Sequence, residues 1–230
     1  MWPRSRTWLG GYPVNEDGVP EILGLLEALY PHPVTELAHD GPWQLLVATI
    51  LSAQCTDRRV NMITPRIFSR CRGPRELAAL PVEEIEDLIK DCGLYHTKAR
   101  NLKAAAEIIH TQFGGVVPAE RDALMMLPGV GRKTANVVLS NCFGFDAIAV
   151  DTHVFRLAHR IGWSEAKDVR GTEDDLMRVL PQASWSRAHH WLILHGRQVC
   201  TARSPQCGRC AIAPYCKQRG VGASSPEEVS

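Results

Sequence analysis

The residues with the clearest chemistry lie in one short stretch, Leu127–Ala135, which reads Leu-Pro-Gly-Val-Gly-Arg-Lys-Thr-Ala. A proline stops one helical pattern there, and Gly129 and Gly131 precede a second helix expected at Arg132–Cys142. Glycines at both places permit a tight turn and let a phosphate approach bare N–H groups at a helix N-terminus. We interpret residues 121–142 as a helix–hairpin–helix that grips a DNA backbone without reading its sequence. An ordinary helical turn is the plainer alternative.

Lys133 stands in the first turn of that second helix, beside the expected phosphate site. Most lysines are solvated surface charges, and the helix dipole disfavours a lysine in a first turn. The helix terminus and desolvation favour a neutral amine, whereas a nearby phosphate favours the charged form. If the first two effects prevail, Lys133 supplies a nucleophilic amine.

A carboxylate follows 18 residues later, in the segment Val150-Asp151-Thr152-His153. The simplest role of Asp151 is to cap a helix expected at Thr152–Ile161, and capping would fix the position of the carboxylate. The helix that carries Lys133 spans roughly 18 Å, and residues 144–150 span roughly 23 Å when extended. The chain can therefore return to the start of that helix, and the lysine and carboxylate can meet in one pocket.

Four of the eight cysteines are packed into 17 residues with the spacing C-x6-C-x2-C-x5-C. Four thiolates this close together hold either zinc or a 4Fe-4S cluster. Zinc sites usually present two short C-x2-C pairs and this chain has one, so the spacing favours iron and sulfur but leaves zinc open. The ligands in either case are Cys200, Cys207, Cys210 and Cys216. The other cysteines are scattered among apolar residues, as buried free thiols usually are: Cys55, Cys71, Cys92 and Cys142.

Helices must position these groups, because apolar residues recur at three- and four-residue spacings along nearly the whole chain. This period predicts helices at 20–29, 43–53, 82–89, 98–113 and 184–199, with most prolines and glycines between them. The only short alternating run is Ile148–Val150, so the expected fold class is all-α. The composition of residues 221–230 predicts a disordered tail.

Composition limits the possible partners and compartments. A net charge of +1 over 230 residues excludes a histone-like coat of positive charge. No acidic residue falls between Trp185 and Pro226, however, where Arg187, Arg197, Arg203, Arg209, Lys217 and Arg219 lie. No signal peptide and no apolar run of roughly 20 residues occurs, so we expect a cytoplasmic protein without a membrane span.

Together these motifs resemble the endonuclease III family, and the match runs from about Ile22 to Arg219. The hairpin, the segment around Asp151 and the four cysteines carry it, together with Leu51–Asp57, Gly93–Tyr95 and His190–Gly196. The resemblance implies two helical domains with a DNA-binding cleft between them. A six-helix barrel with the helix–hairpin–helix would span 35–148, and a domain holding a 4Fe-4S cluster would combine 1–34 with 149–220.

The resemblance also implies an activity: a bifunctional DNA glycosylase and AP lyase of base excision repair. It would act as a monomer on duplex DNA that contains an oxidised or ring-saturated pyrimidine or an abasic site, and associate with the nucleoid when bound. Lys133 would form a Schiff base, assisted by Asp151. The hairpin residues Gly129, Val130, Gly131 and Arg132 would bind the DNA backbone, and Gln54 and Leu94 would fill the stack left by the flipped base. Without the resemblance, Gln54 is an ordinary polar residue at a core edge and Leu94 a buried leucine.

The chain departs from the family pattern in three places. The loop between the first two cluster cysteines touches phosphates in the family and usually carries several basic residues, whereas here it carries Arg203 alone. Cys55 stands where a small residue such as alanine is usual. About ten extra residues precede the first matched helix, and we assign them no function.

Two other functions compete with this one. A monofunctional mismatch glycosylase of the same superfamily usually lacks a lysine at the position of Lys133. A non-catalytic, zinc-stabilised helical DNA-binding module explains the hairpin and the cysteines, but it leaves Lys133 and Asp151 without a role.

Overall fold

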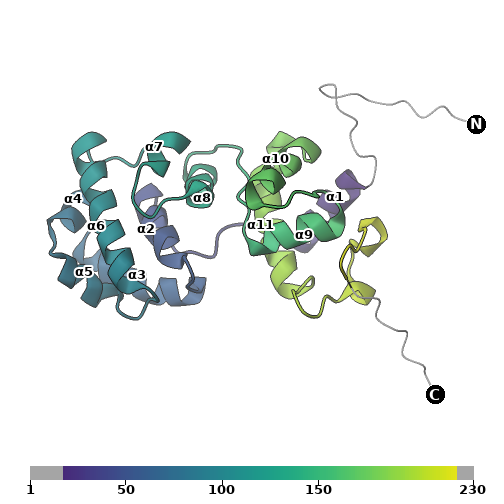
Figure 1. Cartoon of the computed structure of the whole chain (residues 1–230), viewed down its shortest axis with the longest axis horizontal. Coiled ribbons are helices and arrows are strands. Elements are labelled where there is room, and N and C mark those ends of the chain that lie inside the picture. Colours follow the sequence, from purple (N-terminus) through teal and green to yellow (C-terminus); the bar gives the residue numbers. More distant parts are fainter. Residues whose placement is uncertain (1–17, 222–230) are drawn as a thin grey trace, which may run out of the picture. The chain divides into compact units, whose positions relative to one another are not determined.

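The computed structural model describes residues 18–221, and every regular element within them is a helix (Figure 1). The expected all-α class is confirmed, and Ile148–Val150 forms no strand. Of the tail 221–230 that was expected to be disordered, all but Val221 lies outside the described residues, as do residues 1–17. None of the described helices is both long and apolar enough to cross a bilayer.

The chain divides into two compact units, each described here by itself. The continuous unit runs from Val34 to Ala149, and the split unit combines the residues up to Pro33 with those from Val150 onward. The continuous unit contains α2 (Pro42–Ser52), α3 (Asp57–Arg70), α4 (Pro74–Ala79), α5 (Val82–Ile89), α6 (Tyr95–Gln112), α7 (Arg121–Met125) and α8 (Arg132–Cys142). The split unit contains α1 (Val19–Leu29), α9 (Thr152–Ile161), α10 (Val169–Val179), α11 (Trp185–Gln198) and the short 3-10 turns η1 (Gln182–Ser184), η2 (Cys207–Arg209) and η3 (Ala213–Tyr215).

The core of the continuous unit is built around α2. Every residue of α2 from Leu45 to Leu51 is buried, as expected for a helix that is apolar all round and surrounded by other helices. It packs against α3, α6 and α8, while α6 also lies against α4 and α5 (Figure 1). Helix α8 presents Ala135, Val138 and Leu139 to this core, so the helix that carries Lys133 is anchored on the best-packed part of the unit.

The buried side-chain amide of Asn136 connects α8 to α7 and to the segment that follows α8. Asn136, one turn after Lys133, is 1% exposed. Its Oδ1 accepts from Arg121 Nε of α7 at 2.8 Å, and its Nδ2 donates to the carbonyl of Ile148 at 2.9 Å. Because a buried amide left unpaired is costly, this network fixes the two hairpin helices and the chain segment that leads to Asp151.

The split unit is organised by α9. Its buried residues Val154, Leu157, Ala158 and Ile161 recur at helical spacing, and they form an apolar stripe that packs against α10 and α11. Helix α9 ends at Gly162, which has φ 94°. Helix α1 packs on α11, where Trp191 Nε1 donates to the carbonyl of Tyr30 at 3.0 Å.

Candidate active site and cluster site

The hairpin between α7 and α8 uses its two glycines for different reasons. Gly129 has φ 82°, and a Cβ there would lie 3.1 Å from the Asn101 side chain, so both the turn and the packing require glycine. Gly131 has φ −90°, and a Cβ there would meet nothing within 4 Å. The protein itself therefore does not require glycine at 131, but a ligand that approaches the start of α8 closely would. Val130, between them, is buried and holds the hairpin to the core.

Lys133 is exposed in the first turn of α8. No side chain caps this helix, its first turn contains no acidic residue, and Arg132 precedes the lysine. Within its own unit, no carboxylate forms an ion pair with Lys133. The positive end of the helix dipole and the lysine charge therefore act together at the surface and attract an anion such as a DNA phosphate.

Asp151 is the N-cap of α9, as the sequence predicted. Its Oδ1 accepts from the backbone N–H groups of His153 and Val154, both at 2.8 Å. Among the described residues of its unit, none donates a hydrogen bond to Oδ2, and Asp151 is only partly buried. One oxygen thus holds the carboxylate in place while the other remains available to a ligand. Burial lowers the pKa of neighbouring His153, even though Asp151 raises it, so that imidazole is neutral at pH 7.

Lys133 and Asp151 belong to different units, and each is placed within its own. Lys133 lies at the start of α8 in the continuous unit, and Asp151 at the start of α9 in the split unit. Their meeting in one pocket stays a prediction from the sequence.

Gln54 and Leu94 occupy two turns with unusual backbones. Three non-glycine residues within 18–221 have positive φ: Gln54 at 54°, Leu94 at 59° and Gln218 at 50°. A left-handed conformation costs such a residue about 1 kcal/mol or more, and strain of this kind concentrates at functional sites. Leu94 is 61% exposed, so the alternative of a buried leucine is wrong.

The turns of Gln54 and Leu94 lie against each other. A Cβ on Gly93 would sit 3.9 Å from the carbonyl oxygen of Gln54. The Cys92 thiol lies 3.4 Å from the carbonyl oxygen of Leu51, close to the end of α2. The fold therefore places an exposed amide and an exposed leucine, distant in sequence, on adjacent strained turns of the continuous unit.

The four clustered cysteines line one pocket. Its remaining walls come largely from apolar side chains, including Leu157, Ile161, Val199 and Ile212, and its empty space, open solvent included, is about 380 Å³. Donors point at three of the four sulfurs. Arg160 Nη1 lies 3.3 Å from Cys200 Sγ, His195 Nε2 lies 3.3 Å from Cys210 Sγ, and the Gln218 N–H lies 3.4 Å from Cys216 Sγ. Such donors suit thiolate sulfurs that carry negative charge.

A zinc ion and a 4Fe-4S cluster require different spacings of four cysteine sulfurs. No three His, Cys, Asp or Glu side chains within residues 18–221 are grouped so as to hold one metal ion. Zinc requires its sulfurs about 2.3 Å from one centre, whereas the irons of a 4Fe-4S cube share four cysteines over a larger volume. Burial raises the pKa of the Cys210 and Cys216 thiols, so binding of the irons must drive their deprotonation.

His195 connects the cluster pocket to α1. Burial lowers the pKa of His195 to about 4, so the ring is neutral at pH 7. The hydroxyl of Tyr30 lies 3.2 Å from Nδ1, and burial and nearby Cys210 raise the pKa of that hydroxyl. The tautomer with its proton on Nε2 satisfies both contacts, because Tyr30 then donates to Nδ1 and Nε2 donates to Cys210 Sγ.

Two arginines of α9 hold the start of the cysteine segment. Arg156 Nη2 donates to the carbonyls of Gly196 at 2.9 Å and Cys200 at 3.1 Å. One turn later, Arg160 donates to the carbonyls of Thr201 at 2.7 Å and Ala202 at 2.9 Å. Sequence reasoning missed both arginines and His195. The available signal was that Arg156 and Arg160 are four residues apart on the helix after Asp151. The carbonyls that they bind, however, lie some 40 residues away along the chain.

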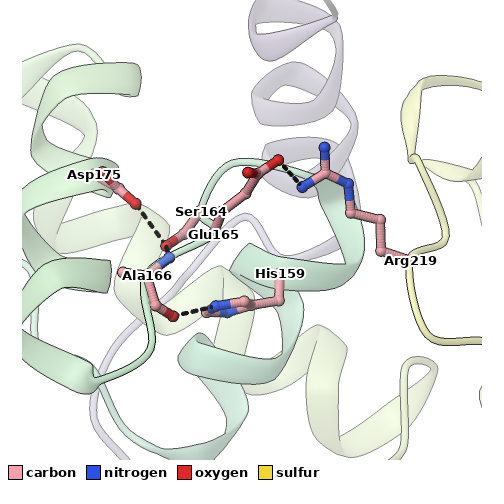
Figure 2. Close-up of polar contacts among 6 residues, drawn as sticks. All are labelled: His159, Ser164, Glu165, Ala166, Asp175 and Arg219. Carbon is pink, nitrogen blue, oxygen red and sulfur yellow. Dashed lines mark hydrogen bonds and ion pairs between the residues drawn. The ribbon is translucent and has the colours of Figure 1, made fainter.

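The end of the cysteine segment is held by α9 and by the loop that follows α9. Lys217 and Arg219 donate backbone N–H groups to the carbonyls of Ile161 and Arg160. Figure 2 shows the side-chain contacts of that loop. Arg219 pairs with Glu165, His159 Nε2 lies 2.7 Å from the carbonyl of Ala166, and Ser164 donates to Asp175 of α10 at 2.8 Å. Helix α9 therefore carries Asp151 at its start and supports both ends of the cysteine segment.

The loop between Cys200 and Cys207 presents one charged side chain to solvent. Arg203 is exposed, and the turn around it is closed by Thr201 Oγ1, which donates to the carbonyl of Ser204 at 2.7 Å. Two of the other basic residues of this region are already paired, Arg187 with Glu27 and Arg219 with Glu165.

The chain matches known families and proteins over most of its length. Residues 47–182 match the HhH-GPD superfamily of base excision DNA repair proteins, and residues 200–216 match the iron–sulfur binding domain of endonuclease III. Endonuclease III of Bacillus subtilis is 47% identical over 191 residues, covering 83% of this chain and 87% of that protein. Endonuclease III of Escherichia coli K12 is 46% identical over 199 residues, covering 86% and 94%.

Solved structures give the same result. A trapped endonuclease III–DNA covalent intermediate superimposes with a TM-score of 0.83 at 45% identity, covering 87% of this chain and 94% of the other. A thermostable thymine-DNA glycosylase shares the fold, with a TM-score of 0.78 at 23% identity, covering 86% and 95%. The relatives and the matched iron–sulfur domain establish that this chain carries a 4Fe-4S cluster, which decides against zinc. The chain belongs to the endonuclease III family.

Proposed function

We propose that the chain is a bifunctional DNA glycosylase and AP lyase of base excision repair that acts as a monomer on duplex DNA. It removes oxidised or ring-saturated pyrimidines and then cleaves the strand. The observation that carries this function is Lys133, exposed directly after the hairpin glycines in a chain 45% identical to an endonuclease III trapped covalently on DNA. The continuous unit would be the barrel domain and the split unit the cluster domain, with the nucleoid as the place of action.

Lys133 begins the reaction on a nucleotide flipped out of the duplex. Its neutral amine attacks C1′ of the sugar, and the base leaves with the electron pair of the glycosidic bond. The nitrogen, positively charged after the attack, loses one proton. The C1′–O4′ bond of the sugar ring then breaks, O4′ takes up a proton, and a protonated Schiff base joins Lys133 to C1′. The positively charged imine draws electrons from C2′, a proton leaves C2′, and the C3′–O bond breaks on the 3′ side of the lesion.

Asp151 assists these steps through its unbonded oxygen. With Oδ1 held by two backbone N–H groups, Oδ2 is fixed in direction and can stabilise the positive charge that develops on the sugar. The same oxygen can accept and return protons between steps. Asn136 supports this placement because it ties the helix of Lys133 to Ile148, three residues before Asp151.

Asp151→Asn is expected to slow base removal by about 10²- to 10⁴-fold, the usual contribution of a positioned acid–base group. Asparagine caps helices about as well as aspartate, so the melting temperature should change little. Asp168→Asn is the matched control, because Asp168 caps α10 by accepting from the Gly171 N–H at 2.8 Å. Single-turnover excision and thermal melting of both variants provide the check, and a wild-type excision rate in Asp151→Asn would refute the role.

DNA contacts are proposed at two places in the continuous unit. Gly129, Val130, Gly131 and Arg132 would bind phosphates at the start of α8, where an open backbone meets the positive end of the helix. Gln54 and Leu94 would fill the gap in the stack after the base has flipped out, because both side chains project from rigid, strained turns. An exposed leucine suits this role, since its apolar surface leaves water when it enters the stack.

Arg203 of the split unit would make about one strong phosphate contact. Each neutralised phosphate contributes roughly −0.9 to the slope of log affinity against log salt. Ser204→Lys should therefore tighten binding to an abasic-analogue duplex and steepen that slope by about one unit, and Arg203→Ala should do the opposite. A salt series of binding isotherms for both variants measures this. Unchanged slopes in both would mean that the loop does not touch DNA.

The 4Fe-4S cluster would be held by Cys200, Cys207, Cys210 and Cys216. When bound, it supplies four iron–thiolate bonds and local negative charge rather than a reacting group. Arg156, Arg160 and His195 orient the segment and its sulfurs, as the residues around a metal site commonly do.

The function is tested with a duplex that contains thymine glycol. Wild-type protein should release the base, cleave the strand without heat or alkali, and become covalently attached to DNA when borohydride reduces the Schiff base. Base release without strand cleavage would support a monofunctional glycosylase instead. Binding without either reaction would support a non-catalytic module.

A further inference from the structure

Lys98, in the first turn of α6, is a buried charged residue with no part in the reaction above. It is 4% exposed, and lysine is almost never buried unless it is paired. No carboxylate within residues 18–221 forms an ion pair with it. A buried ammonium without an opposite charge is costly, so the position of Lys98 requires a reason.

The contacts of Lys98 lead to the turns of Gln54 and Leu94. Its Nζ donates to the carbonyl oxygen of Leu51 at 2.8 Å, three residues before Gln54. The same Nζ lies 3.1 Å from Cys92 Sγ, two residues before Leu94. Its backbone N–H donates to the carbonyl of Leu94 itself at 3.1 Å. Lys98 thus bonds to the end of α2, directly before the Gln54 turn, and to the Leu94 turn. The Cys92 thiol also lies 3.4 Å from the Leu51 carbonyl oxygen.

We propose that Lys98 is a positioning residue that holds the Gln54 and Leu94 turns together in the strained conformation from which both side chains enter DNA. The proposal rests on the proposed function for the roles of Gln54 and Leu94. Strained conformations persist only where the surroundings fix them, and the hydrogen bonds of one buried ammonium join the two turns. Without that ammonium, each turn can relax independently, and the two side chains lose their common orientation.

Lys103 provides a matched control on the same helix. It is half-buried, and its Nζ also donates to two backbone carbonyls, those of Ala78 at 2.7 Å and Leu80 at 2.8 Å. These carbonyls belong to the last turn of α4 and to its C-cap residue, a region that carries neither Gln54 nor Leu94. Lys98→Met and Lys103→Met each remove two hydrogen bonds of a lysine Nζ from a different part of the unit, and Lys103→Met also removes an ion pair with Glu107 at 3.3 Å. Methionine fills nearly the volume of the lysine stem.

The first measurement needs no DNA: amide hydrogen exchange of the full-length protein with its cluster. Lys98→Met should speed exchange in both 51–56 and 90–96, whereas Lys103→Met should speed it only around 78–80. Cys92→Ala, which removes one of the two Nζ acceptors but leaves the bond from Lys98 to the Leu51 carbonyl, should speed exchange more in 90–96 than in 51–56. Wild-type exchange of both segments in Lys98→Met would overturn the proposal.

The second measurement places 2-aminopurine opposite an abasic analogue, so that its fluorescence rises when the opposite base loses its stacking. Lys98→Met should lose most of this rise and excise thymine glycol about tenfold to a hundredfold more slowly, as a displaced group commonly does. Its affinity for undamaged duplex should stay unchanged, and Lys103→Met should match wild type in all three. A normal fluorescence rise in Lys98→Met would also overturn the proposal. Failure of wild-type protein to excise any pyrimidine lesion would instead overturn the proposed function, leaving the exchange result to decide whether Lys98 joins the turns.

Discussion

Lys133→Gln is expected to abolish borohydride trapping on a thymine-glycol duplex and to reduce strand cleavage by roughly 10³-fold or more, because the nucleophile itself is removed. A 10³-fold loss corresponds to about 4 kcal/mol of transition-state stabilisation. The amide nitrogen of glutamine has no available lone pair, so it cannot form the bond to C1′. Binding to the lesion should survive, because the hairpin glycines and Arg132 are unchanged.

Lys133→Gln should be slightly more stable than wild type, although it is far less active. Lys133 is exposed, so its replacement leaves no cavity and no buried partner. It stands in the first turn of α8, which contains no acidic residue, where a positive charge is unfavourable by about 0.3–1 kcal/mol. Removing the charge should raise the melting temperature slightly, which would indicate that the lysine is kept for its chemistry.

Lys90→Gln is the control for this experiment. Lys90 is an exposed lysine of the same unit, directly after α5, and its replacement should leave trapping and cleavage at wild-type levels. Undiminished trapping in Lys133→Gln would transfer the nucleophilic role to another amine. Mapping the peptide attached to DNA would then identify that amine.

Local chemistry explains which helices could be predicted from the sequence. The bounds of α5, α8 and α9 agree with the predicted ranges, because their apolar residues recur at helical spacing and proline, glycine or aspartate directly precedes each helix. Asp151 caps α9 as predicted, since capping depends only on residues three apart. Helix α3 was not predicted. It is polar on average and contains Pro65 in its interior, although Thr56 caps its start and its buried residues pack against the core.

The candidate site could be predicted only in part, because much of it depends on distant contacts. The hairpin and Lys133 lie within a few residues of one another, so the local sequence shows them. Gln54 and Leu94 came from the family resemblance, and nothing in a leucine indicates a φ of 59°. Lys98 meets Leu51 across 47 residues, and Arg160 meets Cys200 across 40. Such pairs become visible only when the fold brings them together.

The identity of the metal group is a case where spacing narrowed the choice without deciding it. Four cysteines at C-x6-C-x2-C-x5-C suit two kinds of centre, because the same thiolates bind zinc and iron. The sequence contains no information on the distances between sulfurs, which distinguish one ion from a cube. The match to the iron–sulfur binding domain of endonuclease III decided between them.

Cys210→Ser is expected to remove most of the iron and to unfold the segment from Cys200 onward. In that segment, up to Val221, Ile212 is the one buried apolar side chain. Its burial contributes about 3 kcal/mol at most, whereas ordering a residue costs roughly 1–2 kcal/mol in backbone entropy alone. Twenty or so residues cannot be held by that burial, so the bonds to the cluster must stabilise them. Structural metal sites contribute on the order of 10 kcal/mol, enough to account for the difference.

The loss should extend to Asp151, because α9 supports both ends of the cysteine segment. Arg156 and Arg160 donate to carbonyls of Cys200, Thr201 and Ala202. If that segment unfolds, two partly buried guanidinium groups lose acceptors and the helix that carries Asp151 loses a packing partner. Cys210→Ser should therefore lower excision as well as iron content, although the cysteine does not take part in the reaction.

Cys142→Ser is the matched control, since Cys142 is a partly buried free thiol at the end of α8. Iron content, visible absorbance and thermal melting should all match wild type in that variant, apart from a small loss of packing. In Cys210→Ser the visible absorbance should fall together with hydrogen-exchange protection of both 200–216 and α9. Hydrogen-exchange protection of α9 at the wild-type level after loss of the iron would show that the helix is stable without the cluster. The cluster would then stabilise only its own segment, and the link to Asp151 drawn from Arg156 and Arg160 would be wrong.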